Sequence, residues 1–182
     1  MSKASIELVR GDVDPAGIAG ELDGLYCYEQ VVVHWCKGVQ NRLTGMATFV
    51  LPDELTEVAD EAGEVAERLA ARIAQLGGEI TADPADFVTR SPIDEFTLPD
   101  DFGDVVAILT TALDYQRHVI GVYADLLDRL GDADVVTHRL LTKILAGKLA
   151  REDELEAVVA HARTVKPLSS RVATLPVVRP GA

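Results

Sequence analysis

Four polar residues interrupt the apolar stripes of this chain at positions that a helix would turn towards its neighbours. Glu29 lies in the first stripe, Gln116 in the third, and Lys148 and Arg151 lie one turn apart in the fourth. A buried ammonium or guanidinium group is tolerated only when it is paired and hydrogen-bonded. Glu29 is the candidate partner of the two cations, and the amide of Gln116 can serve either of them. These residue types predict an internal salt-bridge network, or the remnants of an active site at the same positions.

The stripes that carry these residues repeat at alternating spacings of four and three. They cover residues 18–43, 55–76, 105–130 and 141–162, and the second stripe has no polar interruption. This spacing keeps one face of a helix turned towards neighbouring helices. The sequence therefore predicts an all-α, antiparallel four-helix bundle with polar groups facing inward at mid-height.

Capping residues and glycines set the expected bounds of the helices. The expected helices are residues 15–43, 52–76, 104–130 and 133–165. Asp14 precedes Pro15 and is the expected cap of the first helix, and Asp132 is the expected cap of the fourth. Gly77 and Gly78 end the second helix. The bundle is thus expected over residues 1–165, and residues 166–182 are expected to form an extended, basic, proline-containing tail.

The segment from 79 to 103 differs from the helices. It contains Pro84, Pro92 and Pro99 and no sustained helical period, so it is expected to be a long connection with at most a short turn of helix. One long crossover between two helical hairpins is the topology of ferritin-like bundles, whereas simple up-down bundles have short loops throughout. The crossover between helices 2 and 3 is therefore the most specific feature of the predicted fold.

Charge and hydropathy exclude several classes of function. The formal net charge is −13, all 30 acidic residues lie at or before Glu156, and the four basic residues Arg163, Lys166, Arg171 and Arg179 follow it. An acidic body repels phosphate backbones, so nucleic-acid binding is not expected. No window reaches the ~18 apolar residues of a membrane span, and the first residues lack the apolar core of a signal peptide. The expected location is the cytoplasm.

The two cysteines, Cys27 and Cys36, lie nine positions apart on one expected helix. At a rise of 1.5 Å per residue they are separated by about 13 Å, which is too far for a disulfide between them. Two reduced thiols in the core are the expectation, with a redox or metal role as the alternative.

Several runs of residues resemble the ferritin-like superfamily, and within it the Dps-like branch of bacteria and archaea. The runs are ASIELVR with DVD (4–10 and 12–14), LAARIAQLGG (69–78), DVVAIL (104–109) and LLTKIL (140–145). Together they cover roughly residues 2–160 in the order and spacing of that family. The resemblance implies a subunit that forms dimers and hollow cages.

The resemblance also implies two iron ions inside the bundle, held by a Glu from each of two helices and a Glu-x-x-His pair from each of the other two. At the matching positions this chain has Glu29, Ala62, Val65, Gln116, Lys148 and Arg151. An alignment on residues 12–14 would place Cys27 instead of Glu29 in the first helix. Most ligands are thus replaced, and two of the replacements carry positive charge.

The function predicted from these departures is that of a non-catalytic structural or binding oligomer of the iron-storage and oxidative-protection family. No cofactor is expected, iron being the alternative, and the salt-bridge network is expected in place of the metals. The partners expected are copies of the same chain, in a dimer or hollow cage, and possible capture of another protein through residues 166–182.

Two other functions stay open at this point. A metal-binding or peroxide-consuming protein would use a relocated site, built from Glu29, Glu61, Glu64, Asp114 and His118. Alternatively, a cavity beside Ala62 and Val65 would hold an anionic small molecule against Lys148 and Arg151.

Each polar residue of the core also has a purely structural interpretation. Lys148 and Arg151 would extend along the bundle to its surface, as long basic side chains often do. Gln116 would be an ordinary core amide with its hydrogen bonds satisfied. Whether the two cations face the core is therefore the decisive structural question.

Overall fold

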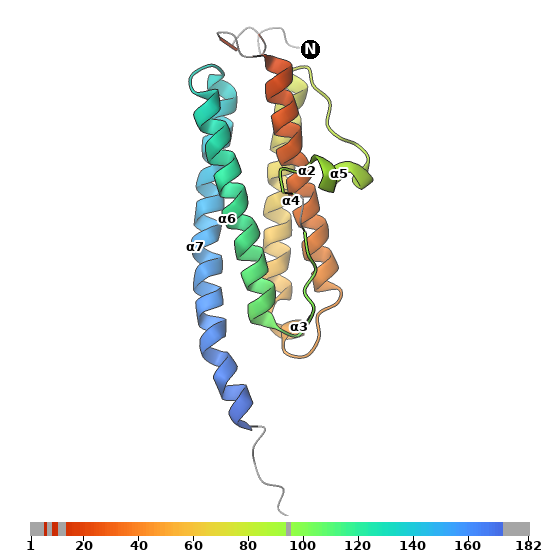
Figure 1. Ribbon diagram of the computed structural model, residues 1–182, viewed down its shortest axis with the longest axis vertical. Helices are drawn as coiled ribbons and strands as arrows, with labels where there is room; N and C mark the ends of the chain where they lie inside the picture. Colours follow the sequence, from red (N-terminus) through yellow and green to blue (C-terminus); the bar gives the residue numbers. More distant parts are fainter. Residues whose placement is uncertain (1–5, 7–8, 11–13, 94–95, 173–182) are drawn as a thin grey trace, which may run out of the picture.

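The computed structural model describes residues 6, 9–10, 14–93 and 96–172, apart from the side chains of residues 165–172. Most of the run at 4–14 that resembles the family lies outside these residues. The long helices are α2 (Pro15–Gln40), α4 (Pro52–Gln75), α6 (Val105–Leu130) and α7 (Val135–Val172). They lie side by side along one axis (Figure 1). The predicted four-helix bundle is confirmed.

The chain forms two antiparallel hairpins, α2 with α4 and α6 with α7. A short helix, α3 (Ala47–Val50), lies in the turn of the first hairpin. Because α4 and α6 run in the same direction, the chain has to return along the bundle between them, as Figure 1 shows. This return is the predicted long crossover, and it contains the short helices η1 (Pro84–Asp86) and α5 (Phe87–Arg90).

Aspartates cap α2 and α7, as predicted for α2 and differently for α7. The carboxylate of Asp14 accepts hydrogen bonds from the backbone N–H groups of Ala16 and Gly17 at 3.1 and 3.2 Å. In α7 the cap is Asp134 and not Asp132, so the helix begins two residues later than predicted. The reason is tertiary: Asp134 is buried against a side chain of α4, a contact that Asp132 in the exposed turn does not make.

The far end of α7 also differs from the prediction. Its helical backbone continues to Val172, seven residues beyond the expected end at Val165, so residues 166–172 are not extended. The helix therefore continues through Pro167, although a proline inside a helix removes one backbone hydrogen bond and crowds the carbonyl four residues earlier. Residues 173–182 lie outside the described part of the chain, and the extended tail stays a prediction there.

Side chains of α2 hold the crossover against the bundle. Buried Asp23 accepts hydrogen bonds from the backbone N–H and the hydroxyl of Thr81, both at 2.7 Å, and forms an ion pair with Arg90 at 3.3 Å. Further along, the indole N–H of Trp35 donates to the carbonyl of Thr97 at 2.8 Å. At the start of the crossover, Gly77 has a positive φ of 83°, which favours glycine.

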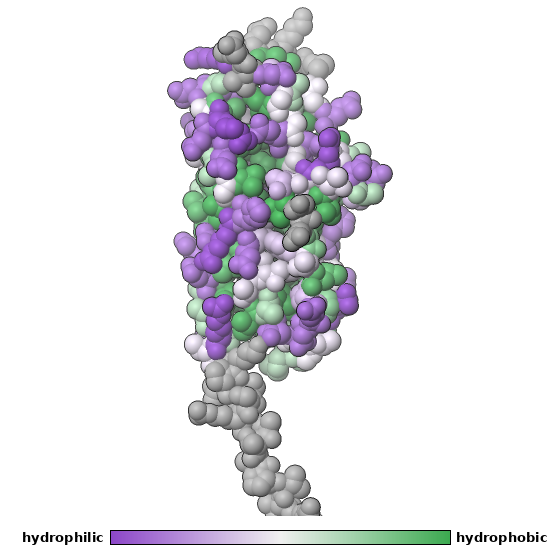
Figure 2. Space-filling view, in the orientation of Figure 1, coloured by the Kyte–Doolittle hydropathy of each residue, from purple (hydrophilic) through white to green (hydrophobic). Residues whose placement is uncertain are grey.

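The core between the hairpins is apolar along most of its length. Its fully buried aliphatic side chains include Leu22, Leu25, Leu55, Leu69, Ile73, Ile108, Leu109, Leu141 and Ile144. The surface in Figure 2 is mostly hydrophilic, with apolar side chains in separate groups. In the described residues, no helix is both long and apolar enough to cross a membrane.

Candidate functional site

A buried ion pair joins α2 to α7 in the middle of the bundle. The carboxylate of Glu29 is fully buried, and Lys148 is 8% exposed. The ammonium group of Lys148 donates to one oxygen of Glu29 at 2.7 Å, and the hydroxyl of Tyr123 donates to the other at 3.1 Å. Lys148 therefore faces the core, and both carboxylate oxygens of Glu29 are engaged.

The electrostatics of this pair combine opposing effects on Glu29. Burial raises the pKa of Glu29 above its ordinary value, whereas the charge and hydrogen bond of Lys148 and the hydroxyl of Tyr123 lower it. Burial and the neighbouring Glu29 raise the pKa of Tyr123 well above its ordinary value, so Tyr123 remains a hydrogen-bond donor. The geometry is that of an ion pair held in place by a neutral phenol.

Gln116 contributes to the centre through the backbone of Lys148. Its amide nitrogen donates to the carbonyl oxygen of Lys148 at 2.6 Å, and the side chain is buried. The expectation that this amide would serve a cationic head group is therefore not met. The carbonyl of Lys148 is the partner because α6 and α7 are neighbours at this level, and the bond fixes their relative position.

Arg151 is buried but pairs with glutamates of α4 and α7 instead of Glu29. It makes two hydrogen bonds to Glu61, one of them at 3.0 Å, and lies 3.0 Å from Glu154, 3.4 Å from Glu54 and 3.5 Å from Glu57. The hydrogen bonding that Arg151 donates to Glu61 is the largest cause of the raised pKa of Arg151. One turn of helix from Lys148, the guanidinium is thus directed into the seam between α4 and α7.

The remaining positions of the predicted site are apolar or exposed. Ala62 and Val65 are buried on α4 and offer no ligand atom. Glu64, Asp114 and His118 are exposed. Over the described residues, no three His, Cys, Asp or Glu side chains form a group that could hold a metal ion. The structure therefore does not bring together the residues of the relocated site.

The centre also lacks the free charge and the space that an anionic ligand would need. Lys148 is paired with Glu29 and Arg151 with Glu61, so both cations already have carboxylate partners. The cavity that borders Tyr28 and Gln116 has a volume of about 20 Å³. That is room for about one water molecule.

A second buried ion pair was missed by the sequence reasoning. Arg72 of α4, 3% exposed, donates to Asp134 at 2.7 Å, to Thr137 at 2.7 Å and to Gln75 at 3.0 Å. Burial would raise the pKa of Asp134, but the hydrogen bonds from Thr137 and Arg72 outweigh it and the pKa is lowered. The available signal was that Arg72 lies three residues from Leu69, on the buried side of its helix.

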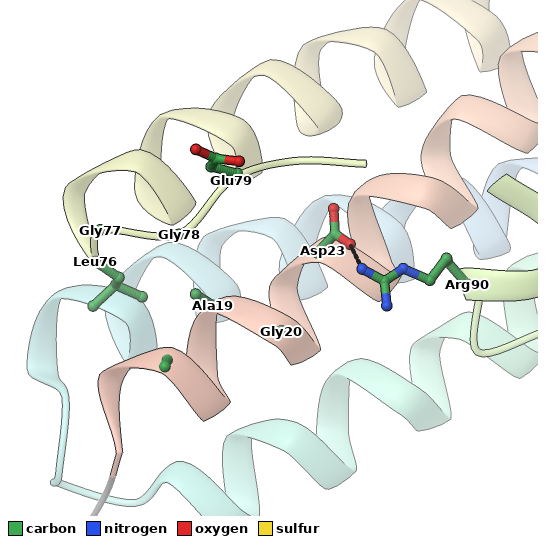
Figure 3. Close-up of a pocket in the computed structure, with 9 residues that line it drawn as sticks. Ala19, Gly20, Asp23, Leu76, Gly77, Gly78, Glu79 and Arg90 are labelled. Atoms are coloured by element: carbon green, nitrogen blue, oxygen red, sulfur yellow. Dashed lines mark ion pairs between the residues drawn. The ribbon is translucent and has the colours of Figure 1, made fainter. Parts of the chain in front are cut away.

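A larger cavity, of about 210 Å³, lies between α2 and the start of the crossover. Figure 3 shows Asp23 and Arg90 facing each other at one side of it, with Gly77 and Gly78 at the other. Asp23 is already bonded to Thr81 and Arg90. These groups hold the crossover in place, and they leave no buried acceptor for a ligand.

Comparison with known proteins identifies the family. A sequence model described as the ferritin-like domain matches residues 19–165. The chain belongs to the ferritin-like domain family. A comparison of this ferritin-like chain with curated proteins returns no match.

Solved structures resemble the ferritin-like chain at low identity. A thioferritin from Bacteroides fragilis, described as dodecameric and bacterioferritin-related, is 20% identical with a TM-score of 0.82, covering 91% of this chain and 98% of its own. A Dps1 variant from Mycobacterium smegmatis is 19% identical with a TM-score of 0.72, covering 82% and 99%. A bacterioferritin from Desulfovibrio desulfuricans, described with a diiron site, is 22% identical with a TM-score of 0.69, covering 93% and 94%. These likenesses show the fold.

The two thiols of the ferritin-like chain are expected to be unreactive until it unfolds. Cys27 and Cys36 are free and buried, and burial raises the pKa of Cys36 to about 12. At pH 8 the thiolate fraction of Cys36 is then about a thousandfold below that of an ordinary thiol, and the thiolate is the reacting form. Alkylation by iodoacetamide, followed by mass spectrometry with and without denaturant, measures this.

The Cys27→Ser variant is the control, because it reports on Cys36 alone. Rapid alkylation of this folded variant, at the rate of a free cysteine, would contradict the buried position of Cys36.

Proposed function

We propose that this ferritin-like protein is a non-catalytic subunit in which an internal ion pair takes the place of the family's iron centre. The observation that carries the proposal is the ammonium group of Lys148, 2.7 Å from buried Glu29. In this proposal Glu29, Gln116, Lys148 and Arg151 stand at former ligand positions. Ala62 and Val65 occupy two more.

The side chains at this centre do not fit a pair of iron ions. Iron of this class is held by several carboxylates and imidazoles with positions left open. Here both oxygens of Glu29 already accept hydrogen bonds, and Lys148 places a positive charge beside them. Within the described part of the chain, no buried side-chain nitrogen or oxygen lacks a hydrogen-bond partner. A dication would have to displace Lys148 and leave its charge buried and unpaired, which is costly.

The assembly is also a proposal. The thioferritin from Bacteroides fragilis is described as dodecameric, and its structure matches 98% of its length to this chain. We extend this to a homo-oligomer of the present chain, with native mass spectrometry as the measurement of its size. A single species of one chain would contradict the proposed assembly. A cytoplasmic location stays a prediction of the sequence.

Iron loading tests the loss of the metal centre. After incubation with ferrous iron under air and removal of loosely bound metal, the protein is expected to retain far less than one iron per chain. The physical reason is that Lys148 and Glu29 neutralise each other, so the described side chains of this centre offer no group of ligands for a dication. Elemental analysis and the absorbance change of iron oxidation are the measurements.

A bacterioferritin with a diiron site, loaded in the same way, is the positive control. The matched variant is Glu29→Gln, which removes the central carboxylate and should leave the low iron content unchanged. Two tightly held irons per chain, lost in that variant, would overturn the proposal.

A further inference from the structure

Three large apolar side chains are exposed at α3 and the residue that precedes it, in the turn between α2 and α4. Met46 is 69% exposed, Phe49 83% and Val50 51%. We refer to Met46, Phe49 and Val50 as the α3 patch. Single exposed apolar residues are common, whereas a contiguous group of large ones is a candidate contact surface. The first hairpin does not cover these side chains, so the patch is available to a partner.

Three exposed aspartates lie near the α3 patch, together with one exposed cation, Arg42, which lies 4.1 Å from the centre of the Phe102 ring. Asp53 follows the patch at the start of α4, and Asp100 and Asp101 lie in the end of the crossover. The crossover is held at this end of the bundle, since the N–H of Thr44 donates to the carbonyl of Phe102 at 3.1 Å. The chemistry that fits this surface is an apolar segment that also carries positive charge.

The chain itself supplies such a segment. Residues 173–182 read ATLPVVRPGA, with Leu175, Val177 and Val178 as apolar side chains and Arg179 as a cation. This stretch contains no acidic residue. Its composition thus complements the α3 patch and the aspartates beside it.

The length of α7 decides where this segment starts. α7 has 38 residues and its hairpin partner α6 has 26. At 1.5 Å per residue, α7 is about 18 Å longer than α6. Figure 1 shows that its far end lies beyond the end of the bundle at which α3 is found. Ten further residues can span at most about 36 Å from Val172.

We propose that residues 173–182 of one copy dock on the α3 patch of a neighbouring copy. The overhang of α7 carries Val172 past the end of its own bundle. A return to its own patch would need the chain to reverse direction after Val172. Pro176 and Pro180 have a fixed φ that favours an extended segment over such a reversal. This inference rests on the proposed assembly of several copies.

Photo-crosslinking in the full chain tests the proposal. One copy carries a benzoylphenylalanine at position 49, and a co-expressed second copy carries the mass-tagged tail Val177→Ile. Trypsin releases residues 172–182 as one peptide, because Arg179 precedes Pro180 and is not cut. The expected product joins the peptide around position 49 to the mass-tagged peptide 172–182.

The matched control carries the photo-reactive residue at position 135. Val135 is 54% exposed and lies at the start of α7, at the opposite end of the bundle. At least tenfold less crosslinking to residues 172–182 is expected there. Native mass spectrometry before irradiation distinguishes failure of the proposed assembly from failure of the proposed docking. A mass that corresponds to a single chain would contradict the assembly. If the protein is an oligomer but position 49 crosslinks elsewhere, only to the tail of its own copy, or not at all, the proposed docking is wrong and the assembly stands.

Discussion

Lys148→Met is expected to lower the free energy of unfolding by about 3–5 kcal/mol, because it removes one partner of a buried ion pair and leaves the other charge uncompensated. Glu29 is fully buried, and in this variant only Tyr123 would remain bonded to it. Methionine keeps the length of the lysine side chain, so the loss reports on charge more than on volume. Equilibrium denaturation at neutral pH measures the change.

The triple variant Glu29→Leu, Tyr123→Phe, Lys148→Met is the control for this prediction. It replaces the ion pair and its phenol donor with apolar groups of similar size, and such replacements are neutral or stabilising by about 1–4 kcal/mol. We therefore expect a triple variant at least as stable as the natural chain and with the same oligomeric state. A triple variant as unstable as Lys148→Met would contradict the view that the pair is structural and replaceable.

The pH dependence of the Lys148→Met variant has a definite sign. Burial raises the pKa of Glu29 and Lys148 lowers it, so removal of Lys148 raises the pKa of Glu29 in the folded chain further above its unfolded value. At pH values between the unfolded and the folded pKa of Glu29, this carboxyl group keeps its proton in the folded chain and has lost it in the unfolded chain. The stability of the variant should therefore fall as the pH rises from the unfolded pKa of Glu29 through its raised folded pKa, and more steeply than that of the natural chain.

Asp134→Ala is expected to be as damaging, at about 3–5 kcal/mol, because Arg72 would be left buried without its carboxylate. The variant also loses the side-chain cap of α7, which by itself is worth about 1 kcal/mol. Denaturation at neutral pH measures the loss.

The same variant makes a prediction about acid. The pKa of Asp134 is lowered on folding, so the contribution of Asp134 to stability is present above its unfolded pKa and is lost as the pH falls. The variant should therefore be less sensitive to acid than the natural chain.

Asp14→Ala is the matched control for Asp134→Ala. Asp14 caps α2 with the same pair of backbone hydrogen bonds but is exposed. Its loss should cost about 1 kcal/mol, the value of a cap alone. Equal losses in the two variants would mean that the pairing of Arg72 with Asp134 adds nothing to the cap.

The sequence alone determined the number of long helices, most of their ends, and the side of each long helix that is buried. These properties are local, because the spacing of apolar residues and the identity of a cap depend on neighbours within about one turn. They indicated inward faces for Lys148 and Glu29, and the structure then decided that both side chains are buried. The local properties were also sufficient to indicate the crossover, since three prolines within 79–103 exclude a continuous helix.

Only the tertiary structure decided which charged groups meet. Arg151 and Lys148 lie one turn apart on the same stripe, yet one reaches Glu61 of α4 and the other Glu29 of α2. The choice of carboxylate partner depends on the rotation and axial offset of packed helices and on the reach of long side chains. None of these can be derived from the spacing of apolar residues within one helix. The same reason explains why Asp134 is the cap of α7: its carboxylate is fixed by Arg72, 62 positions earlier in the chain.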